Sequence, residues 1–217
     1  MRYKAVLFDF DYTLGDATEA IYAGFCHAFT AMGRPEPELE AVRRTVGLPV
    51  QDAYTQLTGD SAPENRARFY ALFHPVARDL QARGVVALCP GARALLEALR
   101  DAGAALAVVS NKNTESLEEV LEAKGLRVCF AYVVGGDRVS RHKPDPEGVL
   151  WVLDQLALAP EEALYCGDTV IDAQTARRAG TDFCAVLNGA TPAEAFLDYP
   201  KVLVAPGLSE LQAWLGL

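Results

Sequence analysis

Short apolar runs and segments of helical periodicity divide the chain into strands and helices. Residues 5–8 (AVLF) form an uninterrupted apolar run, which is typical of a strand buried on both faces in a parallel sheet. From residue 85 onward, apolar runs alternate with helical segments, and this alternation is typical of α/β proteins. The pattern predicts five further strands, at residues 104–109, 130–134, 163–166, 183–187 and 202–205.

The stretch between the first strand and residue 85 shows helical periodicity instead. Residues 16–19 (DATE) have the form of a capping box with Asp16 in the cap position, and apolar residues then recur at helical spacing. A longer helical segment covers residues 65–83, and Pro75 inside it predicts a kink or a break near His74. This stretch therefore reads as a small all-helical unit inserted after the first strand.

These elements predict two domains built around a doubly wound parallel sheet. Residues 1–15 and 84–217 would form an α/β core domain, and residues 16–83 would form a helical cap domain. Ligands of open α/β sheets bind in the crevice at the carboxyl ends of the strands. We therefore expect the cap to lie over that edge of the sheet.

Composition excludes several classes of partner. The 217 residues are 51% hydrophobic, carry a net charge of -9 and contain no run of Lys and Arg, which disfavours a nucleic-acid polymer as partner. No stretch approaches the roughly 18 apolar residues that cross a membrane. The five cysteines are scattered without a C-x-x-C pair, which disfavours zinc and fits a cytoplasmic protein. We expect a monomer or a homodimer that acts on a small molecule.

The first strand ends in residues that can carry out chemistry. Asp9, Asp11 and Thr13 follow it, and alternation along an extended chain would point both carboxylates to the same side. Two carboxylates about 4 Å apart repel each other by about 4 kcal/mol at an effective dielectric constant near 20. Such a pair needs a proton or a metal cation. An isolated D-x-D-x-T could equally be a solvated loop with an Asx turn.

Three more segments place polar residues at the same edge of the sheet. Ser110 ends the second predicted core strand, Asp168 ends the fourth, and Asp172 follows near the start of the next helix. Lys143 lies in a loop. Carboxylate oxygens suit magnesium, and an ammonium group suits a phosphate. An aspartate can itself act as a nucleophile toward phosphorus.

Four motifs in order resemble those of the haloacid dehalogenase superfamily, in its phosphatase branch with a helical cap after the first strand of a Rossmann-like core. They stand at residues 8–14 (FDFDYTL), 108–112 (VVSNK), 142–146 (HKPDP) and 167–172 (GDTVID). The resemblance covers nearly the whole chain. It implies a phosphoric monoester hydrolase that depends on Mg²⁺ and forms an aspartyl phosphate.

The resemblance also implies roles for individual residues. Asp9 would attack phosphorus, and Asp11 would act as general acid and then as general base. The metal would be held by the Asp9 carboxylate, the backbone carbonyl of Asp11 and Asp168, while Asp172 would orient the water shell of the metal or hold Lys143. The phosphate would be bound by Thr13, Ser110, Asn111 and Lys143.

The substrate is a separate question. Residues 110–112 (SNK) and 46–49 (VGLP) are similar to stretches of phosphoglycolate phosphatases, which favours phosphoglycolate. One alternative is a sugar-phosphate mutase of the β-phosphoglucomutase type, which usually has Glu where this chain has Gly167. Another is a phospho-accepting signalling domain, which would need no second acid such as Asp11.

Several side chains keep two interpretations each. Tyr12 replaces the glycine usual in the family, and it could narrow the site or reach the cap. Asp172 could instead pair with Arg177 or Arg178, and Lys112 is expected to face solvent. Two arginines of the cap, Arg43 and Arg44, could meet an anionic substrate, although arginines on a helix are most often solvated. The histidines are expected to be structural or exposed; they are His27, His74 and His142.

Overall fold

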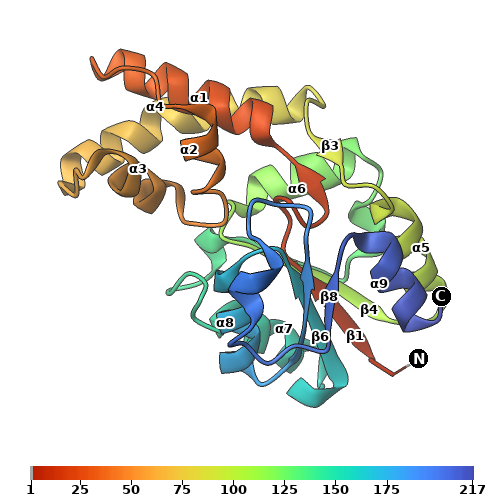
Figure 1. Cartoon of the computed structure of the whole chain (residues 1–217). Helices are drawn as coiled ribbons and strands as arrows, with labels where there is room; N and C mark the ends of the chain where they lie inside the picture. Colours follow the sequence, from red (N-terminus) through yellow and green to blue (C-terminus); the bar gives the residue numbers. More distant parts are fainter. Residues whose placement is uncertain (1) are drawn as a thin grey trace.

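A six-stranded parallel sheet forms the centre of the computed structural model, which describes residues 2–217 (Figure 1). The strand order is β5-β4-β1-β6-β7-β8, so β1 lies in the interior between β4 and β6. This arrangement confirms the predicted α/β class. The strands are β1 (Ala5–Phe8), β4 (Ala105–Val109), β5 (Tyr132–Val134), β6 (Ala163–Gly167), β7 (Asp182–Val186) and β8 (Leu203–Ala205).

Alternate residues of the buried strands pack on opposite faces of the sheet. Val6 and Phe8 face a core completed by α5 (Ala92–Asp101), α6 (Thr114–Ala123) and α9 (Leu208–Leu215). Ala5 and Leu7 face a second core completed by α7 (Glu147–Leu156) and α8 (Val170–Ala179). Because both faces are covered, the strands can be apolar at every position. The α/β part also contains short 3₁₀ segments, at Arg127–Cys129, Gly136–Arg138, Pro160–Glu162 and Ala193–Phe196.

The helical insert lies between β1 and the rest of the sheet in sequence and has a hydrophobic core of its own. It contains α1 (Thr18–Ala31), α2 (Leu39–Arg43), α3 (Val50–Thr58) and α4 (Pro63–Ala82). Phe69 lies at its centre, with ring centroids 5.1 Å from Phe25 and 4.8 Å from Tyr54. Figure 1 shows these helices gathered at one end of the molecule, with α4 next to α6. The division of the chain into domains 1–15 with 84–217 and 16–83 stays a prediction.

The insert joins the core through a small two-stranded antiparallel sheet. Its strands are β2 (Gly15–Asp16) and β3 (Ala87–Leu88), so the chain leaves and re-enters the core at one place. The predicted capping box at residues 16–19 is wrong, because the residue before α1 is Ala17, whose side chain has no acceptor. Asp16 instead accepts a hydrogen bond from the amide of Thr18 at 2.8 Å.

Of the kink or break predicted near His74, the break does not occur. Helix α4 runs from Pro63 to Ala82 with Pro75 inside it. Phe69, Phe73 and Ala77 are buried on the inner side of α4 and pack in the core of the insert. Tertiary packing therefore outweighs the cost of an interior proline, which is about 3 kcal/mol. No helix within residues 2–217 is both long enough and apolar enough to cross a membrane.

We expect Pro75→Ala to stabilise the protein. Pro75 is exposed, so its replacement loses little packing, and the helix regains an N–H donor and loses a steric clash. The expected gain in the free energy of unfolding is about 1–3 kcal/mol, measured by urea denaturation. Pro63→Ala is the matched control, because Pro63 is the first residue of the same helix, where proline is tolerated. Equal effects of the two substitutions would contradict this account of α4.

Candidate active site

The register of three neighbouring strands brings their carboxyl ends together. Phe8 at the end of β1 pairs with Val108 of β4 and with Cys166 of β6. The residues that follow these strands are Asp9, Ser110 and Asp168, and all three side chains are buried. The amide of Asp9 donates to the carbonyl of Cys166 at 2.9 Å, which continues the ladder past β1. The predicted convergence at the carboxyl edge is therefore present.

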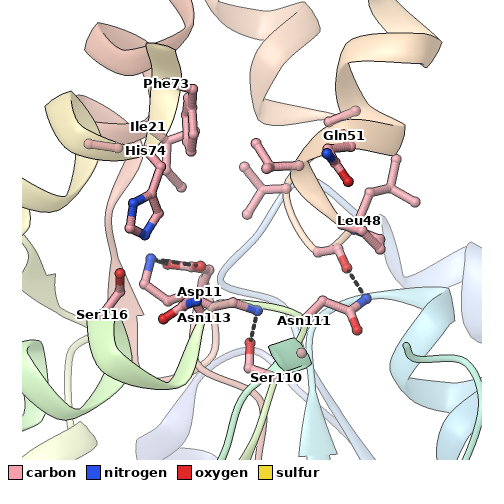
Figure 2. A pocket seen from close by; sticks show the side chains of 18 of the residues that line it. Asp11, Ile21, Leu48, Gln51, Phe73, His74, Ser110, Asn111, Asn113 and Ser116 are labelled. Carbon is pink, nitrogen blue, oxygen red and sulfur yellow. Dashed lines mark hydrogen bonds and ion pairs between the residues drawn. The ribbon is translucent and has the colours of Figure 1, made fainter. Parts of the chain in front are cut away.

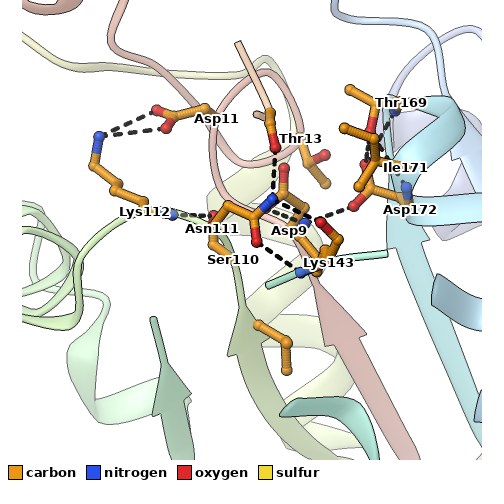
Figure 3. A network of polar contacts seen from close by, with 12 residues as sticks. Asp9, Asp11, Thr13, Ser110, Asn111, Lys112, Lys143, Thr169, Ile171 and Asp172 are labelled. Carbon is orange, nitrogen blue, oxygen red and sulfur yellow. Dashed lines mark hydrogen bonds and ion pairs between the residues drawn. The ribbon is translucent and has the colours of Figure 1, made fainter. Parts of the chain in front are cut away.

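Lys143 lies at the centre of a buried ionic network. Its Nζ is 2.8 Å from Asp9 Oδ1 and 2.6 Å from Asp172 Oδ1, and its side chain is only 4% exposed. It also donates to the hydroxyl of Tyr165 at 3.1 Å. Figure 3 shows Lys143 between Asp9 and Asp172. A loop lysine is thus fixed beside the end of the central strand.

Two local features hold this lysine in place. Asn111 accepts a hydrogen bond from the amide of Lys143 at 2.9 Å and donates to the carbonyl of Gly47 at 2.8 Å. Asn111 therefore joins the lysine loop to the helical insert. Asp172 is fixed by a capping box with Thr169 at the start of α8. Of the two partners considered for Asp172, the structure has Lys143 and not an arginine of α8.

Burial and charge shift the pKa values of this network. Desolvation raises the pKa of Asp9 to about 6, with Lys143 opposing the rise and Asp172 adding to it. Desolvation, with Asp172 and Asp9, also raises the pKa of Asp168 well above its usual range. Burial alone would lower the pKa of Lys143, but Asp172 and Asp9 raise it well above the usual value. The network thus favours the protonated form of Lys143, but this one positive charge does not balance the carboxylates around it.

The donor set fits a hard divalent cation. One carboxylate oxygen from each of Asp9, Asp168 and Asp172 lies within 4.8 Å of the others. Asp9 Oδ1 contacts Lys143 without hydrogen-bond geometry, so this buried oxygen has no hydrogen-bond donor. Gly189 leaves room for Asp168, since a Cβ atom there would lie 2.0 Å from Asp168 Oδ2. Oxygen ligands of this kind suit Mg²⁺.

Asp11 does not join the acidic cluster. The strand ends at Phe8 and the chain turns at Tyr12, whose φ is 59°, so the alternation expected for Asp9 and Asp11 does not continue. The Asp11 carboxylate instead pairs with Lys112 at 3.3 Å, with side-chain exposures of 12% and 9%. Figure 3 shows this pair apart from the Lys143 network. The expectation that Lys112 faces solvent is therefore wrong.

Thr13 and Tyr12 make contacts that sequence reasoning left open. The Thr13 hydroxyl is buried and donates to Asp168 Oδ1 at 3.4 Å. The Tyr12 hydroxyl lies 2.6 Å from the hydroxyl of Thr18 at the start of α1, and the Arg43 guanidinium lies over its ring. Tyr12 therefore reaches the insert. Arg43 and Arg44 line a separate cavity of about 260 Å³ that Tyr12 also lines.

A cavity of about 230 Å³ lies between the insert and the sheet edge (Figure 2). Asp9, Asp11 and Ser110 form its floor, and residues of α1, α3 and α4 form its walls. His74 of α4 lines it, and Figure 2 shows the imidazole reaching from the helix toward Asp11. Sequence reasoning missed this role. Polar residues that recur along α4, at positions 74, 78 and 81, are the signal that points to it.

Comparisons with known proteins agree with this geometry. Residues 6–186 match the haloacid dehalogenase-like hydrolases. The chain is 31% identical over 192 residues to a phosphoglycolate phosphatase of Pseudomonas putida, covering 86% of this chain and 70% of that protein. It is 29% identical over 225 residues to a phosphoglycolate phosphatase of Aliivibrio fischeri, covering 99% and 97%. A crystal structure of a protein from Bacteroides fragilis, described as haloacid dehalogenase-like, has a TM-score of 0.91 and 32% identity, covering 96% and 99%.

The raised pKa of Asp9 predicts a stability effect that depends on pH. A carboxyl whose pKa is about 6 when folded and 3.8 ordinarily destabilises the fold when it is ionised above pH 6. In the metal-free protein at pH 7.5, Asp9→Asn should therefore raise the free energy of unfolding by up to about 3 kcal/mol. The gain should shrink as the pH falls through 6, because the wild-type carboxyl then takes up its proton.

Urea denaturation in chelator at several pH values measures this difference. Asp101→Asn is the control, since its side chain is 71% exposed and should show no such pH dependence. A loss of stability in Asp9→Asn at pH 7.5 would contradict the account of Asp9 as a buried charge that Lys143 compensates only in part.

Proposed function

The chain belongs to the haloacid dehalogenase-like hydrolase family and is a phosphatase of that family; from this premise we propose a Mg²⁺-dependent hydrolase of a small phosphomonoester. The reaction would proceed through an aspartyl phosphate on Asp9. The observation that best supports this proposal is the position of Asp9, buried beside Lys143 at the floor of the cavity. Asp9 lines the cavity, so a ligand can reach it there, although the side chain is buried from bulk water.

Asp9 has the surroundings that a nucleophile toward phosphorus needs. Its attack requires the ionised carboxylate, and Lys143 at 2.8 Å favours that form against the desolvation that opposes it. The ammonium would also contact the phosphoryl oxygens, with Ser110 and the backbone amide of Asn111 on the other side. Transfer of a phosphoryl group depends mostly on such positioning and charge stabilisation.

The acidic cluster would hold the metal. We assign Mg²⁺ to the carboxylates of Asp9 and Asp168 and the backbone carbonyl of Asp11, with Asp172 holding Lys143 at 2.6 Å. When bound, the cation would neutralise charge on the phosphoryl group and hold it in line with the nucleophile. Thr13 would support this arrangement through its hydrogen bond to Asp168. Its predicted direct contact with phosphate stays a prediction.

Asp11 would carry out the acid–base work on the leaving group. Its carboxylate lines the cavity on the side of Lys112, away from the Lys143 network. From there Asp11 in its protonated form would give its proton to the departing alcohol oxygen, and the resulting carboxylate would take a proton from the water that hydrolyses the aspartyl phosphate. Because Asp9 and Asp11 lie in one loop but face different partners, one can act as nucleophile and the other as acid.

Two alternatives are less well supported. A mutase of the β-phosphoglucomutase type usually has Glu where this chain has Gly167, and a Cβ atom there would lie 2.4 Å from the Asp172 side chain. A phospho-accepting signalling domain needs neither Asp11 nor a cavity closed by a helical insert. The size of the cavity and the phosphoglycolate phosphatases among the relatives favour phosphoglycolate as substrate.

Phosphate release from a panel of small phosphomonoesters tests the proposed reaction. With Mg²⁺ the wild type should turn over, and chelator should abolish turnover. Asp9→Asn should lose about 10³-fold or more in kcat because the nucleophile is gone. Asp101→Asn is the matched control on the surface. Stoichiometric labelling of Asp9 without turnover would indicate a signalling domain, and exchange of phosphate between sugar positions would indicate a mutase.

A magnesium titration tests the metal assignment separately. Asp168→Asn should raise the Mg²⁺ concentration for half-maximal activity by about tenfold or more, because a ligand is lost and the remaining cluster carries less negative charge. Asp137→Asn provides a comparison, since Asp137 lines the same cavity but bonds to Thr114 instead of joining the cluster. An unchanged magnesium requirement in Asp168→Asn would contradict the assignment.

A further inference from the structure

His74 presents an unused hydrogen-bonding atom to the cavity. Its Nε2 is buried without a hydrogen-bond partner, although the ring is held by stacking on Tyr70 at 5.2 Å. Burial and the charge of Arg78 lower the pKa of His74, against weaker opposing effects of Glu115 and Glu119, and Lys112 lowers it slightly further. The imidazole is therefore neutral at pH 7 and has one N–H to donate. A buried polar atom with no partner is costly unless a ligand supplies one.

Lys112 provides positive charge on the same side of the cavity. Its Nζ lies 3.3 and 3.4 Å from the two oxygens of Asp11, which are long distances for a charged pair. An ammonium group has three donor hydrogens, so contact with Asp11 leaves capacity for a further acceptor. Lys112 and Asp11 both line the cavity, and so does His74.

The other charged side chains of the wall already have partners. Arg78 pairs with Glu119 at 2.6 Å and with Glu115 at 2.8 Å. Asp137 accepts hydrogen bonds from the amide and the hydroxyl of Thr114, both at 2.6 Å. The charge of Arg78 is therefore offset within the protein, and the Asp137 carboxylate has hydrogen-bond donors of its own. Among the charged side chains of this wall, Lys112 therefore keeps donor capacity for a ligand, and the imidazole of His74 lines the same cavity.

We propose that His74 and Lys112 bind the distal end of the leaving group and select substrates that carry a carboxylate there. This inference rests on the proposed phosphatase function. The carboxylate would accept hydrogen bonds from Lys112 Nζ and His74 Nε2, while the phosphate lies toward Asp9. Asp11, which contacts Lys112, would then lie between the two ends of the substrate, next to the ester oxygen.

Apolar side chains limit the length of this leaving group. Ile21, Phe25 and Phe73 line the cavity from α1 and α4, and Leu48 lines it from the loop before α3. A long or polar leaving group would place unpaired polar atoms against these side chains. The cavity therefore fits a short hydroxy acid esterified with phosphate better than a long or polar leaving group.

A pair of matched substrates tests this selection. Phosphoglycolate and its neutral carboxamide analogue have nearly the same shape and differ in charge. In the wild type, kcat/KM should be higher for phosphoglycolate. Lys112→Met should reduce the ratio of the two kcat/KM values by about 10-fold or more, mainly through KM, because a hydrogen bond to a charged group is lost. His74→Phe should reduce it less, and Lys112→Arg should retain part of the preference.

Control variants separate selection from general damage. Lys4→Met and His27→Phe alter a lysine and a histidine that are exposed and remote from the cavity, and neither should change the ratio. Equal loss of kcat on both substrates in Lys112→Met, with the ratio of kcat/KM values unchanged, would overturn the inference. Lys112 would then act only through its contact with Asp11. A wild-type preference for the carboxamide would overturn it as well.

A binding measurement keeps this test independent of the proposed reaction. Both ligands can be titrated by calorimetry into Asp9→Asn protein with and without Lys112→Met. If wild type hydrolyses no phosphomonoester, the proposed function fails, and the affinity ratio still decides whether Lys112 recognises a carboxylate. If wild type hydrolyses both substrates and neither variant changes the ratio, the proposed function stands and this inference fails.

Discussion

The buried contact of Lys143 with Asp9 and Asp172 is the interaction on which the site depends. Three separate parts of the chain meet there: the end of β1, a loop and the first turn of α8. Burial of three charged groups is unfavourable unless they compensate one another, and here one ammonium group faces two carboxylates. The surrounding structure adds hydrogen bonds: Asn111 and Tyr165 accept from Lys143, and Thr169 donates to Asp172.

The loop after β1 directs two carboxylates to different partners. Asp9 faces Lys143 and the acidic cluster, whereas Asp11 faces Lys112 and the wall that includes His74 (Figure 3). The turn at Tyr12, with its positive φ, makes this separation possible. Tyr12 also contacts Thr18 at the start of the insert. The same turn therefore separates the two carboxylates and joins the loop after β1 to the helical insert.

Much of the candidate site was predictable because residues at strand ends are near one another in any parallel sheet. Asp9, Ser110 and Asp168 follow adjacent strands, so their proximity follows from strand order and register. Lys143 and Asp172 were predictable from motif spacing. The positions of Lys112 and His74 in the wall of the cavity were not predictable, because they depend on how α4 lies over the sheet edge. Local pattern describes each helix but does not say which of its polar residues faces a cavity.

By itself, the sequence determined the fold class, the helical insert and the residues that gather at the carboxyl edge, because hydrophobic periodicity and strand-end positions are local properties. Tertiary structure alone decided which carboxylate pairs with which lysine or arginine side chain. It placed Asp172 on Lys143 instead of an arginine of its own helix, and Asp11 on Lys112 instead of beside Asp9. It also kept α4 continuous through Pro75. In each case contacts between distant segments outweighed the local preference, and such contacts exist only once the chain has folded.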